Sequence, residues 1–482
     1  MKLFFTGLVT VFGVATASVS TCCDRLRQKL GDTISLPNSE IYNATISGYW
    51  SIQESALQPS CVLRPATARD VSEALKIISN IENCRFAIKG QGHAPAAGFA
   101  NVDGGVTIDM TTLSSVSLQE DLSVVSVGAG AKWIDVYKHL NGSGVQVSGG
   151  RNGNVGVGGL LLGGGISHFT TKVGWACDGV INYELVLSNG SLVNANKNLN
   201  SDLFLALKGG GNNFGVVTRF DLATFPQGNI STRSISYDIS QRAKVFQAFT
   251  NLLNSSNYDP FASLVTGLLY SSASKAWTLT SSLVYTKPVS HPKIFEELSG
   301  IPHKSLVNNI TSLAAFADEE ETPPLNWHFA TATFKPSFQN MQEMFDTLNN
   351  TIYSFSPDGG VTWSIAFEPL VGAMLKNSKH LNVLGSGSVE DGFIVLISAL
   401  WPISAVNSDV QARTRSVLSA WEDNARARGF LQRFQYLNYA APFQSPIFSY
   451  GKDELHRLKL VSEKYDHGQI LQKNVEGFKL PS

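Results

Sequence analysis

The stretch Phe86-Ala-Ile-Lys-Gly-Gln-Gly-His-Ala-Pro95 governs how the rest of the chain is interpreted. Four residues typical of a β-strand lead into Gly90 and Gly92, and His93 follows at once. Glycine turns let backbone N–H groups approach an anionic ligand closely. The imidazole beside them is a nucleophile that could hold a ligand permanently. An isolated match of this kind is more often a plain turn with a surface histidine, so the interpretation needs support elsewhere.

That support is a dense run of glycine further along the chain. Between residues 142 and 179, 13 of 38 residues are glycine, where average usage would give roughly three. Each glycine in a packed helix or strand costs about 0.5–1 kcal/mol relative to alanine. The run is therefore typical of a backbone wound closely around something polar and extended. With the glycine turns at 90–92 and 209–215, it indicates a bound dinucleotide.

Length and charge limit the classes of function. The chain has 482 residues, of which 43% are hydrophobic and 16% charged, and its formal net charge is −1. This length allows two or three domains with ample core. The balanced charge gives no electrostatic reason to expect a nucleic acid or an anionic membrane as partner. No segment after the N-terminus qualifies as a membrane helix, so we expect no membrane span.

The first 17 residues have the features of a secretory signal peptide. Lys2 supplies the positive end, residues 3–14 the short apolar core, and Ala15-Thr-Ala17 the small residues of a cleavage site. The alternative for the same residues is a buried N-terminal helix. Sequons for N-glycosylation fit export, and they begin at Asn43, Asn141, Asn189, Asn229, Asn254, Asn309 and Asn349. We expect a glycoprotein of the secretory pathway.

Cysteine usage points to the same compartment. Four of the five cysteines, Cys22, Cys23, Cys61 and Cys84, lie in the first hundred residues, and Cys177 is the fifth. This clustering predicts one or two disulfides that tie an N-terminal arm to the first domain. Adjacent Cys22 and Cys23 are expected to pair elsewhere, with Cys61 and Cys84 as candidates. No Cys-x-x-Cys or clustered His accompanies them, so we expect no metal site.

Hydrophobic periodicity divides the chain into two parts. Up to about residue 222 it predicts an α/β pattern, with helices over 70–80, 133–140 and 203–207 and strands over 86–89, 106–110, 124–127, 182–187 and 216–222. Beyond about residue 227 it predicts an antiparallel sheet with strands over 264–270, 277–285, 328–334, 361–367 and 393–400, and helices over 243–253 and 337–348.

The expected organisation follows from this division. We predict a signal peptide over 1–17, an arm over 18–56, a ligand-binding domain over 57–227, a second domain over 228–429 and a tail over 430–482 that returns to the first domain. The strict Gly-x-Gly-x-x-Gly fingerprint is absent from the chain, which disfavours a nicotinamide-binding Rossmann domain. No phosphate-binding loop of the Gly-x-x-x-x-Gly-Lys-Ser/Thr type occurs either.

The remaining motifs carry a resemblance to a known family. In chain order they are Lys89-Gly-Gln-Gly-His93, Val106-Thr-Ile-Asp109, Val127-Gly-Ala-Gly130 with Trp133, Val155-Gly-Val-Gly-Gly159, Gly163-Gly-Gly165, Asp202-Leu-Phe204, the run from Gly209 to Thr218, and Tyr436-Leu-Asn-Tyr439. With them the chain resembles, from about residue 55 onward, the flavin-linked oxidases related to the berberine bridge enzyme. These belong to the vanillyl-alcohol-oxidase group of PCMH-type FAD-binding proteins.

The resemblance implies an α+β fold and a cofactor. The fold combines an FAD-binding domain of the PCMH type, made of two α/β subdomains, with a substrate domain whose antiparallel sheet is covered by helices. The cofactor is FAD joined through its 8α-methyl group to His93. Residues expected to bind it are Lys89, Gly90, Gln91, Gly92, His93, Gly156, Gly158, Gly159, Val217 and Asn438. Some relatives have a second link through a cysteine where this chain has Asn152, so we expect a single attachment.

The resemblance also points to the residues that would act on a substrate. Tyr436 is the first candidate for the general base, a role that needs a pKa below the usual value near 10; otherwise it orients the substrate. Glu368, expected at a strand end of the substrate domain, is the second catalytic candidate. Tyr439 is expected to support packing, and His168 to lie near the cofactor.

The family implies a monomeric, secreted FAD-dependent oxidase. It would oxidise a small aromatic, polyketide-like or alkaloid-like metabolite by hydride transfer to the flavin, which O2 then reoxidises to give H2O2. One alternative is a carbohydrate oxidase of the same superfamily. Another is a protein that uses the flavin only as a scaffold, for a redox-neutral cyclisation or for binding a ligand.

Overall fold

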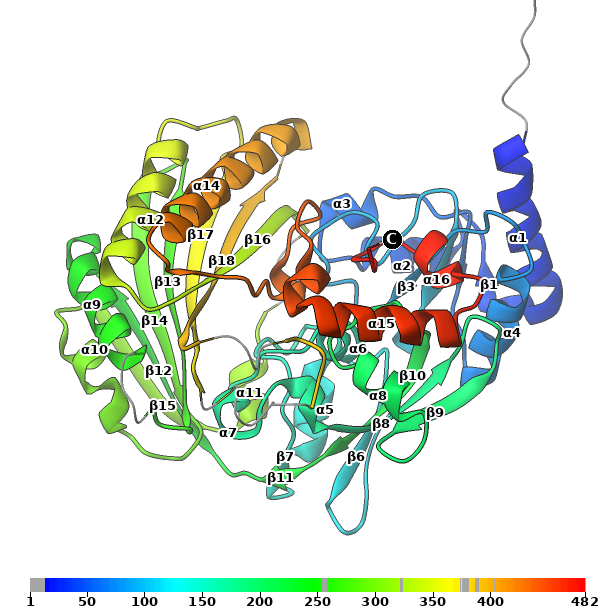
Figure 1. The fold of residues 1–482 in the computed structure, drawn as a ribbon, viewed down its shortest axis with the longest axis horizontal. Helices are drawn as coiled ribbons and strands as arrows, with labels where there is room; N and C mark the ends of the chain where they lie inside the picture. Colours follow the sequence, from blue (N-terminus) through cyan, green and yellow to red (C-terminus); the bar gives the residue numbers. More distant parts are fainter. Residues whose placement is uncertain are drawn as a thin grey trace, which may run out of the picture.

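The computed structural model describes residues 14–253, 258–320, 324–372, 374, 381–385, 390–402 and 404–481 (Figure 1). Most of the predicted signal peptide, residues 1–13, lies outside this part of the chain. Helix α1 (Val14–Leu30) includes the expected cleavage site. Among the described residues, no helix combines the length and the apolar character that crossing a membrane requires.

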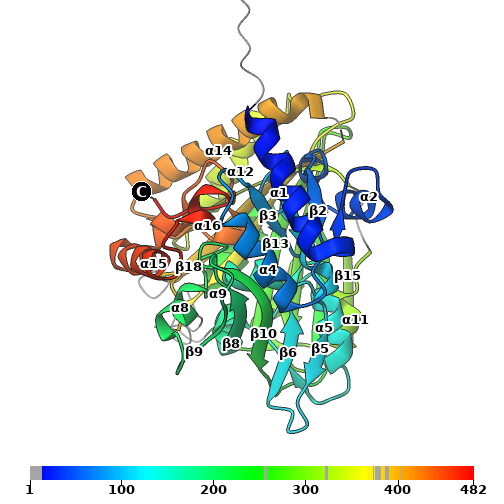
Figure 2. The same cartoon turned by 90° about the vertical axis from the view of Figure 1, so that its right-hand side faces the viewer.

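The turn before His93 follows the last residue of a strand in a small, mainly parallel sheet. β2 (Cys61–Leu63), β4 (Val106–Asp109) and β3 (Phe86–Lys89) run parallel, and β1 (Ile34–Ser35) adds an antiparallel edge. Helix α4 (Ala68–Ile78) begins with a capping box at Thr67 and buries one apolar face. Figure 2 shows α1 beside α4 on this side of the molecule.

A second sheet carries the other glycine turns. It has the strand order β5-β6-β10-β8-β9, with β5 (Val116–Leu118), β6 (Val124–Gly128), β10 (Val216–Ala223), β8 (Val180–Val186) and β9 (Leu192–Asn196). Its pairs are antiparallel. Around it lie α5 (Trp133–Leu140), α6 (Val157–Leu162) and α8 (Ser201–Ala206). A two-stranded ribbon joins β7 (Val145–Gln146) to β11 (Phe225–Pro226).

The largest sheet has eight antiparallel strands in the order β15-β12-β14-β13-β17-β18-β16-β19. Their bounds are β12 (Ile230–Tyr237), β13 (Ala262–Ser271), β14 (Ala276–Tyr285), β15 (Ser305–Thr311), β16 (Asn326–Phe334), β17 (Thr362–Leu370), β18 (Gly392–Trp401) and β19 (Leu431–Gln432). Helices α9 (Arg242–Leu253), α10 (Glu296–Gly300), α12 (Phe338–Ile352) and α14 (Asn407–Ala427) cover its outer face (Figure 1). The expected α+β fold with a helix-covered antiparallel sheet is confirmed.

The N-terminal arm is bound to the first sheet by two disulfides. Cys22 pairs with Cys84 and Cys23 with Cys61, while Cys177 is free and buried. After α1 the arm continues through α2 (Glu40–Ser47) and α3 (Ile52–Ser55). The predicted use of the four early cysteines is therefore confirmed, and the structure supplies the pairing that the sequence left open.

The tail crosses the molecule. Its first strand, β19, pairs with β16 and so extends the eight-stranded sheet. The chain then forms α15 (Lys452–Tyr465), where Lys464 pairs with Asp202 of α8 at 2.7 Å. Near the end, Glu476 pairs with Arg85 at 2.7 Å. Between β19 and α15, residues 436–440 lie against the glycine-rich segment, where the Tyr436 hydroxyl accepts from the Gly165 N–H and Asn438 donates to the Leu160 carbonyl.

Candidate active site

A cavity of about 440 Å³ lies where the two small sheets, the large sheet and the tail meet. Its walls come from parts of segments 88–100, 150–166, 211–220 and 436–440, with Phe329 and Leu396 from the large sheet. The expected site residues that line it are Gly90, Gln91, Gly92, His93, Gly156, Gly158, Gly159, Val217, Tyr436 and Asn438. The structure therefore brings together motifs that are up to about 350 residues apart in the sequence.

The glycines of this wall fit a ligand pressed against the backbone. A Cβ added at Gly159 would meet no protein atom within 4 Å, and one at Gly90 only the Ala129 carbonyl at 3.8 Å. Packing within the protein does not require glycine at these two positions, yet both border the cavity. Any side chain there would fill space that the polar, extended cofactor needs. The lining is therefore compatible with FAD.

His93 follows a turn that only glycine can make. Gly92 has φ +66°, and a Cβ there would lie 2.7 Å from the Tyr49 ring. The His93 imidazole is half-buried and borders the cavity. Burial, and then the charge of Lys132, lower its pKa to about 4. At neutral pH the ring is therefore uncharged and keeps a nucleophilic nitrogen.

Lys89 is a correction to the expected cofactor contacts. Ile88 and Gly90 line the cavity, whereas the intervening Lys89 does not, because successive side chains of a strand point to opposite faces. Its buried ammonium pairs with Asp109 at 3.4 Å and lies over the Tyr49 ring at 5.1 Å. Burial lowers the pKa of Lys89, although Asp109 opposes this effect. Lys89 thus supports the turn from behind.

A cluster of Arg151, Glu368 and Tyr439 lies at the boundary between the cavity and the large sheet. Arg151 Nη2 contacts Glu368 Oε1 at 2.8 Å and Tyr439 Oη at 2.6 Å. The Tyr439 hydroxyl donates to Glu368 Oε1 at 2.9 Å. Arg151 and Tyr439 line the cavity, whereas Glu368, in β17, is 3% exposed and lies behind them. Glu368 is thus neither at the end of its strand nor exposed.

The electrostatics of the cluster keep Arg151 charged. Burial lowers the pKa of its guanidinium, but the charge of Glu368 and the neighbouring Tyr439 outweigh burial and raise it. Burial raises the pKa of Tyr439 well above its ordinary value, and Arg151 opposes that shift. Glu368 Oε2 is buried and has no hydrogen-bond partner among the described residues. The cluster therefore contains a fixed cation, Arg151, a proton donor, Tyr439, and an acceptor oxygen, Glu368 Oε2, that accepts no hydrogen bond from the described residues.

Tyr436 is held differently from Tyr439. Its hydroxyl oxygen accepts from the backbone N–H groups of Gly165 and Ile166, at 3.1 and 3.0 Å, and from Asn438 Nδ2 at 3.1 Å. Burial nevertheless raises its pKa to about 12. This is the opposite of the lowered value that a general base requires. Tyr436 lines the cavity as an anchored side chain.

Three other residues at or near the cavity make hydrogen bonds with protein groups. Asn438 Nδ2 also donates to the Leu160 carbonyl at 3.1 Å. Asn152, which stands where some relatives have a second attachment, donates to Glu319 at 2.6 Å. His168 is buried, contacts Ser263 through Nδ1 at 3.3 Å, and has its pKa lowered to about 3 by burial and by Arg151.

Arg151 and the role of Tyr439 were missed by sequence reasoning. Arg151 stands in the glycine-rich loop 149–153, where a lone charged side chain was the available signal. The loop is fixed by Tyr137, whose hydroxyl donates to the Gly150 carbonyl at 2.6 Å, and by the Gly153 N–H, which donates to Ala317 at 3.1 Å. Tyr439 is expected from the sequence to support packing, whereas in the structure its hydroxyl donates to Glu368 of β17.

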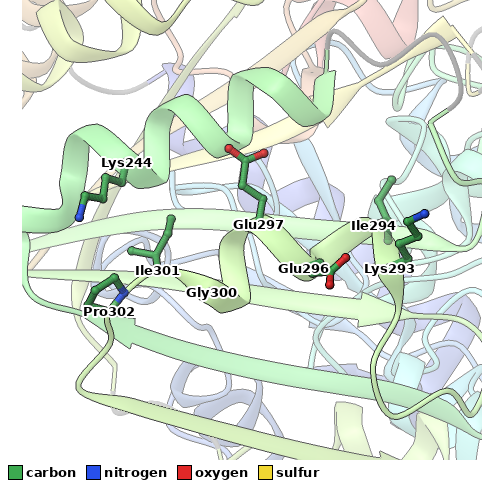
Figure 3. Close-up of a pocket in the computed structure, with 8 residues that line it drawn as sticks. All are labelled: Lys244, Lys293, Ile294, Glu296, Glu297, Gly300, Ile301 and Pro302. Carbon is green, nitrogen blue, oxygen red and sulfur yellow. The ribbon is translucent and has the colours of Figure 1, made fainter.

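A second, wide and open hollow lies on the outer side of the large sheet, between α9 and α10 (Figure 3). Its lining mixes exposed lysines and glutamates, including Lys244, Lys293, Glu296 and Glu297. None of the motif residues borders it, and it has no part in the site. Among the residues that the structure describes, no group of three or more His, Cys, Asp or Glu side chains is arranged to hold a metal ion.

Comparisons with known proteins support FAD as the cofactor. A family model described as an FAD binding domain matches residues 59–196. The FAD-dependent monooxygenase tpcD of Cochliobolus heterostrophus is 35% identical over 454 residues, covering 90% of this chain and 87% of that protein. The FAD-dependent monooxygenase drtC of Aspergillus calidoustus is 32% identical over 478 residues, covering 95% and 90%.

The fold has solved counterparts. The glucooligosaccharide oxidase of Acremonium strictum matches with a TM-score of 0.79 at 19% identity, over 96% of this chain and 99% of that one. Fold, cavity and relatives together define an FAD-dependent oxidoreductase. The chain belongs to the berberine bridge enzyme-like family of FAD-linked oxidoreductases, within the PCMH-type FAD-binding superfamily.

Proposed function

We propose that this protein is an oxidase that removes two electrons and two protons from a small, largely apolar metabolite, with FAD attached once, through His93. The observation that carries the proposal is that Arg151, Tyr439 and His93 line one cavity, with Glu368 bonded to Arg151 and Tyr439 behind its wall. FAD, when bound there, accepts two electrons from a substrate C–H bond and passes them to O2, giving H2O2.

The residues of the cluster handle the proton. Tyr439 borders the cavity, so its hydroxyl oxygen can accept a proton from the substrate while its own proton passes to Glu368 Oε1 along the 2.9 Å hydrogen bond. Arg151 pairs with Glu368 at 2.8 Å and supplies the counter-charge of this carboxylate. Proton transfer to a carboxylate through a tyrosine requires no stable tyrosinate, which accords with the raised pKa of Tyr439. We therefore assign the base to Glu368, acting through Tyr439, in place of Tyr436.

The proposed attachment uses the neutral imidazole of His93. With FAD bound, a C–N bond would replace one C–H bond of the flavin 8α-methyl group and the imidazole N–H bond of His93, and O2 would take up the two electrons and two protons as H2O2. A pKa near 4 keeps the imidazole in the nucleophilic form at neutral pH. Asn152, bound to Glu319, offers no thiol for a second link.

The lining favours an apolar, flat substrate over a sugar. The large sheet contributes Phe329 and Leu396 to the cavity, and the Tyr439 ring lies edge-on to Phe329 with 6.4 Å between centroids. A sugar needs many hydrogen-bonding groups around its hydroxyls, because unpaired polar groups are costly to bury. These side chains instead fit an aromatic or polyketide-like ring system, whose hydroxyl group would reach Arg151 or Tyr439.

We propose oxidation without oxygen insertion, although the relatives tpcD and drtC carry the name monooxygenase. A monooxygenase that inserts one oxygen atom needs a reductant for the other, commonly a reduced nicotinamide. The chain lacks the nicotinamide-binding Rossmann fingerprint. With a panel of phenolic metabolites, an oxidase releases one H2O2 per O2 consumed and incorporates no 18O. Incorporation of label from 18O2 into the product would show monooxygenation instead.

The redox state of the flavin during turnover distinguishes the oxidase from the redox-neutral alternative. An oxidase loses the yellow colour when substrate is added without oxygen and regains it when oxygen is admitted. Conversion of a substrate with no change of colour would favour the scaffold role.

We also propose that the protein is a monomer of the secretory pathway. The two disulfides of the arm support this compartment. Light scattering and the glycan mass of the exported protein test these two points.

A further inference from the structure

Residues 49–51 of the N-terminal arm are hydrogen-bonded to the backbone of the segment that contains His93. The Trp50 N–H donates to the Gly92 carbonyl at 3.1 Å, and Ser51 Oγ donates to the Ala94 carbonyl at 3.1 Å. Further along, the Tyr49 hydroxyl donates to the Ala100 carbonyl at 2.9 Å. These bonds fix the arm on both sides of His93, although the arm lies outside the family's cofactor motifs.

One aromatic side chain of the arm covers the imidazole. The rings of Trp50 and His93 are stacked, with 4.2 Å between centroids and 15° between planes. On its other side Trp50 stacks on Trp327 of β16, at 4.0 Å and 21°. Neither tryptophan lines the cavity, whereas His93 does. The imidazole is therefore supported by an indole on one side and borders the cofactor cavity on another.

The arm also holds Trp50 against the large sheet. Gln53 makes two bonds to the Trp327 backbone: its Nε2 donates to the carbonyl at 2.7 Å, and its Oε1 accepts from the N–H at 3.0 Å. The Ile52 N–H donates to the Leu325 carbonyl at 2.9 Å. Trp50 is thus fixed between two domains by its own backbone and by its neighbours. Its ring has little freedom to move away from His93.

We propose that Trp50 is a positioning residue for flavin attachment, which rests on the proposed bond to His93. Rotation about the last side-chain torsion of histidine has only broad preferences, so the ring needs a contact to fix its plane. The stacked indole supplies that contact and excludes water from one face of the imidazole. It thereby aims the ring nitrogen at the cavity in its uncharged form. Trp50 stacks on the His93 ring from outside and does not line the cavity itself.

The test follows the rate of attachment rather than turnover. Full-length protein produced under riboflavin limitation is mixed with FAD, and samples are denatured over time to measure flavin fluorescence on the polypeptide. We expect Trp50→Phe to attach flavin several-fold more slowly than wild type and Trp50→Leu at least tenfold more slowly. Trp277→Leu, a tryptophan replacement in the large sheet whose contacts include Tyr270, Phe345 and Asn349, should attach at the wild-type rate.

The outcomes are distinguishable. If Trp50→Leu does not fold, as judged by circular dichroism, Trp50→Phe still decides, since a wild-type rate in this variant would overturn the positioning role. Equal rates in folded Trp50→Leu and wild type would overturn it as well. Wild type that binds FAD only reversibly would refute both the attachment and the role of Trp50. Wild type with rapid attachment but no oxidase activity would refute the proposed reaction and leave the role of Trp50 supported.

Discussion

The Tyr439 hydroxyl donates to Glu368 Oε1 at 2.9 Å, although the two residues are 71 positions apart and belong to the tail and to β17. Tyr439 borders the cavity and Glu368 lies behind it. Arg151, from the glycine-rich loop, contacts both of them. This arrangement couples the cavity to a buried carboxylate through one hydroxyl, and it separates the functions of the two tyrosines in Tyr436-Leu-Asn-Tyr439.

Replacing each tyrosine by phenylalanine should have different effects. Tyr439→Phe removes the hydroxyl that links the cavity to Glu368, so substrate oxidation should slow by about 10²–10⁴-fold. Tyr436→Phe removes the acceptor of the Gly165 and Ile166 N–H groups, which should lower the free energy of unfolding by about 1–3 kcal/mol. Stopped-flow bleaching of the flavin and urea unfolding measure the two effects. A larger loss of rate in Tyr436→Phe would restore Tyr436 as the base.

Glu368→Gln keeps the shape of the side chain and removes its charge. We expect substrate oxidation to slow by about 10²–10⁴-fold. Arg151 would lose its counter-ion, and breaking such a buried pair costs about 3–5 kcal/mol of stability. Glu319→Gln is the matched control, because Glu319 is exposed and accepts from Asn152 at the edge of the site. A near-normal rate of flavin bleaching in Glu368→Gln would contradict its assignment as the base.

The disulfides of the arm should dominate the response to reducing agents. Cys22–Cys84 and Cys23–Cys61 close segments with sequence separations of 62 and 38. Loss of a native disulfide typically costs about 2–5 kcal/mol, so a reductant should lower the urea midpoint markedly. Cys177→Ser should keep this response, since Cys177 is free. More than one free thiol in the unfolded, unreduced wild-type protein would contradict the pairing.

Glu54 should make stability depend on pH. Burial raises its pKa to about 7 in the folded protein, although backbone N–H groups of Ala100 and Gly98 oppose the shift. The unfolded chain releases this proton near the ordinary glutamate pKa of 4.5, so the folded protein binds more protons between about pH 4.5 and 7. Stability should therefore fall as pH rises through this window, by an amount on the order of 3 kcal/mol.

Glu54→Gln is the control for that dependence. The amide cannot titrate, so this variant should lack the fall in stability between about pH 4.5 and 7. Urea unfolding at a series of pH values compares the two proteins. Parallel curves for wild type and Glu54→Gln would show that Glu54 does not titrate in this range.

Elements with strong apolar periodicity were predictable from the sequence. β3 and α5 have the predicted bounds, and β13, β14, β16, β17 and β18 lie at the predicted places. β12 and β15 were missed because serine, threonine, arginine and asparagine fill their sequences, Ile-Ser-Thr-Arg-Ser-Ile-Ser-Tyr and Ser-Leu-Val-Asn-Asn-Ile-Thr. Edge and near-edge strands tolerate such polar residues, and pairing with neighbours supplies what the pattern lacks.

The cofactor side of the site was more predictable than the substrate side. Glycine turns and His93 lie within short motifs, so their spacing identifies them. Glu368 lies 217 positions from Arg151 and 71 from Tyr439, and no local pattern reveals such contacts. The same holds for Trp50, which reaches Trp327 only after the arm folds against the large sheet. The misplacement of Lys89 was avoidable, because strand alternation sets it opposite to Ile88 and Gly90.

The central claim is that FAD lies in this cavity and is bonded to His93 alone. Intact-mass analysis of denatured wild-type protein, followed by peptide mapping, tests it most directly. The account predicts one covalently bound FAD, carried by the peptide that contains His93, and its complete loss in His93→Ala. A flavin attached to another residue, or a colourless protein that binds no FAD when it is supplied, would contradict it.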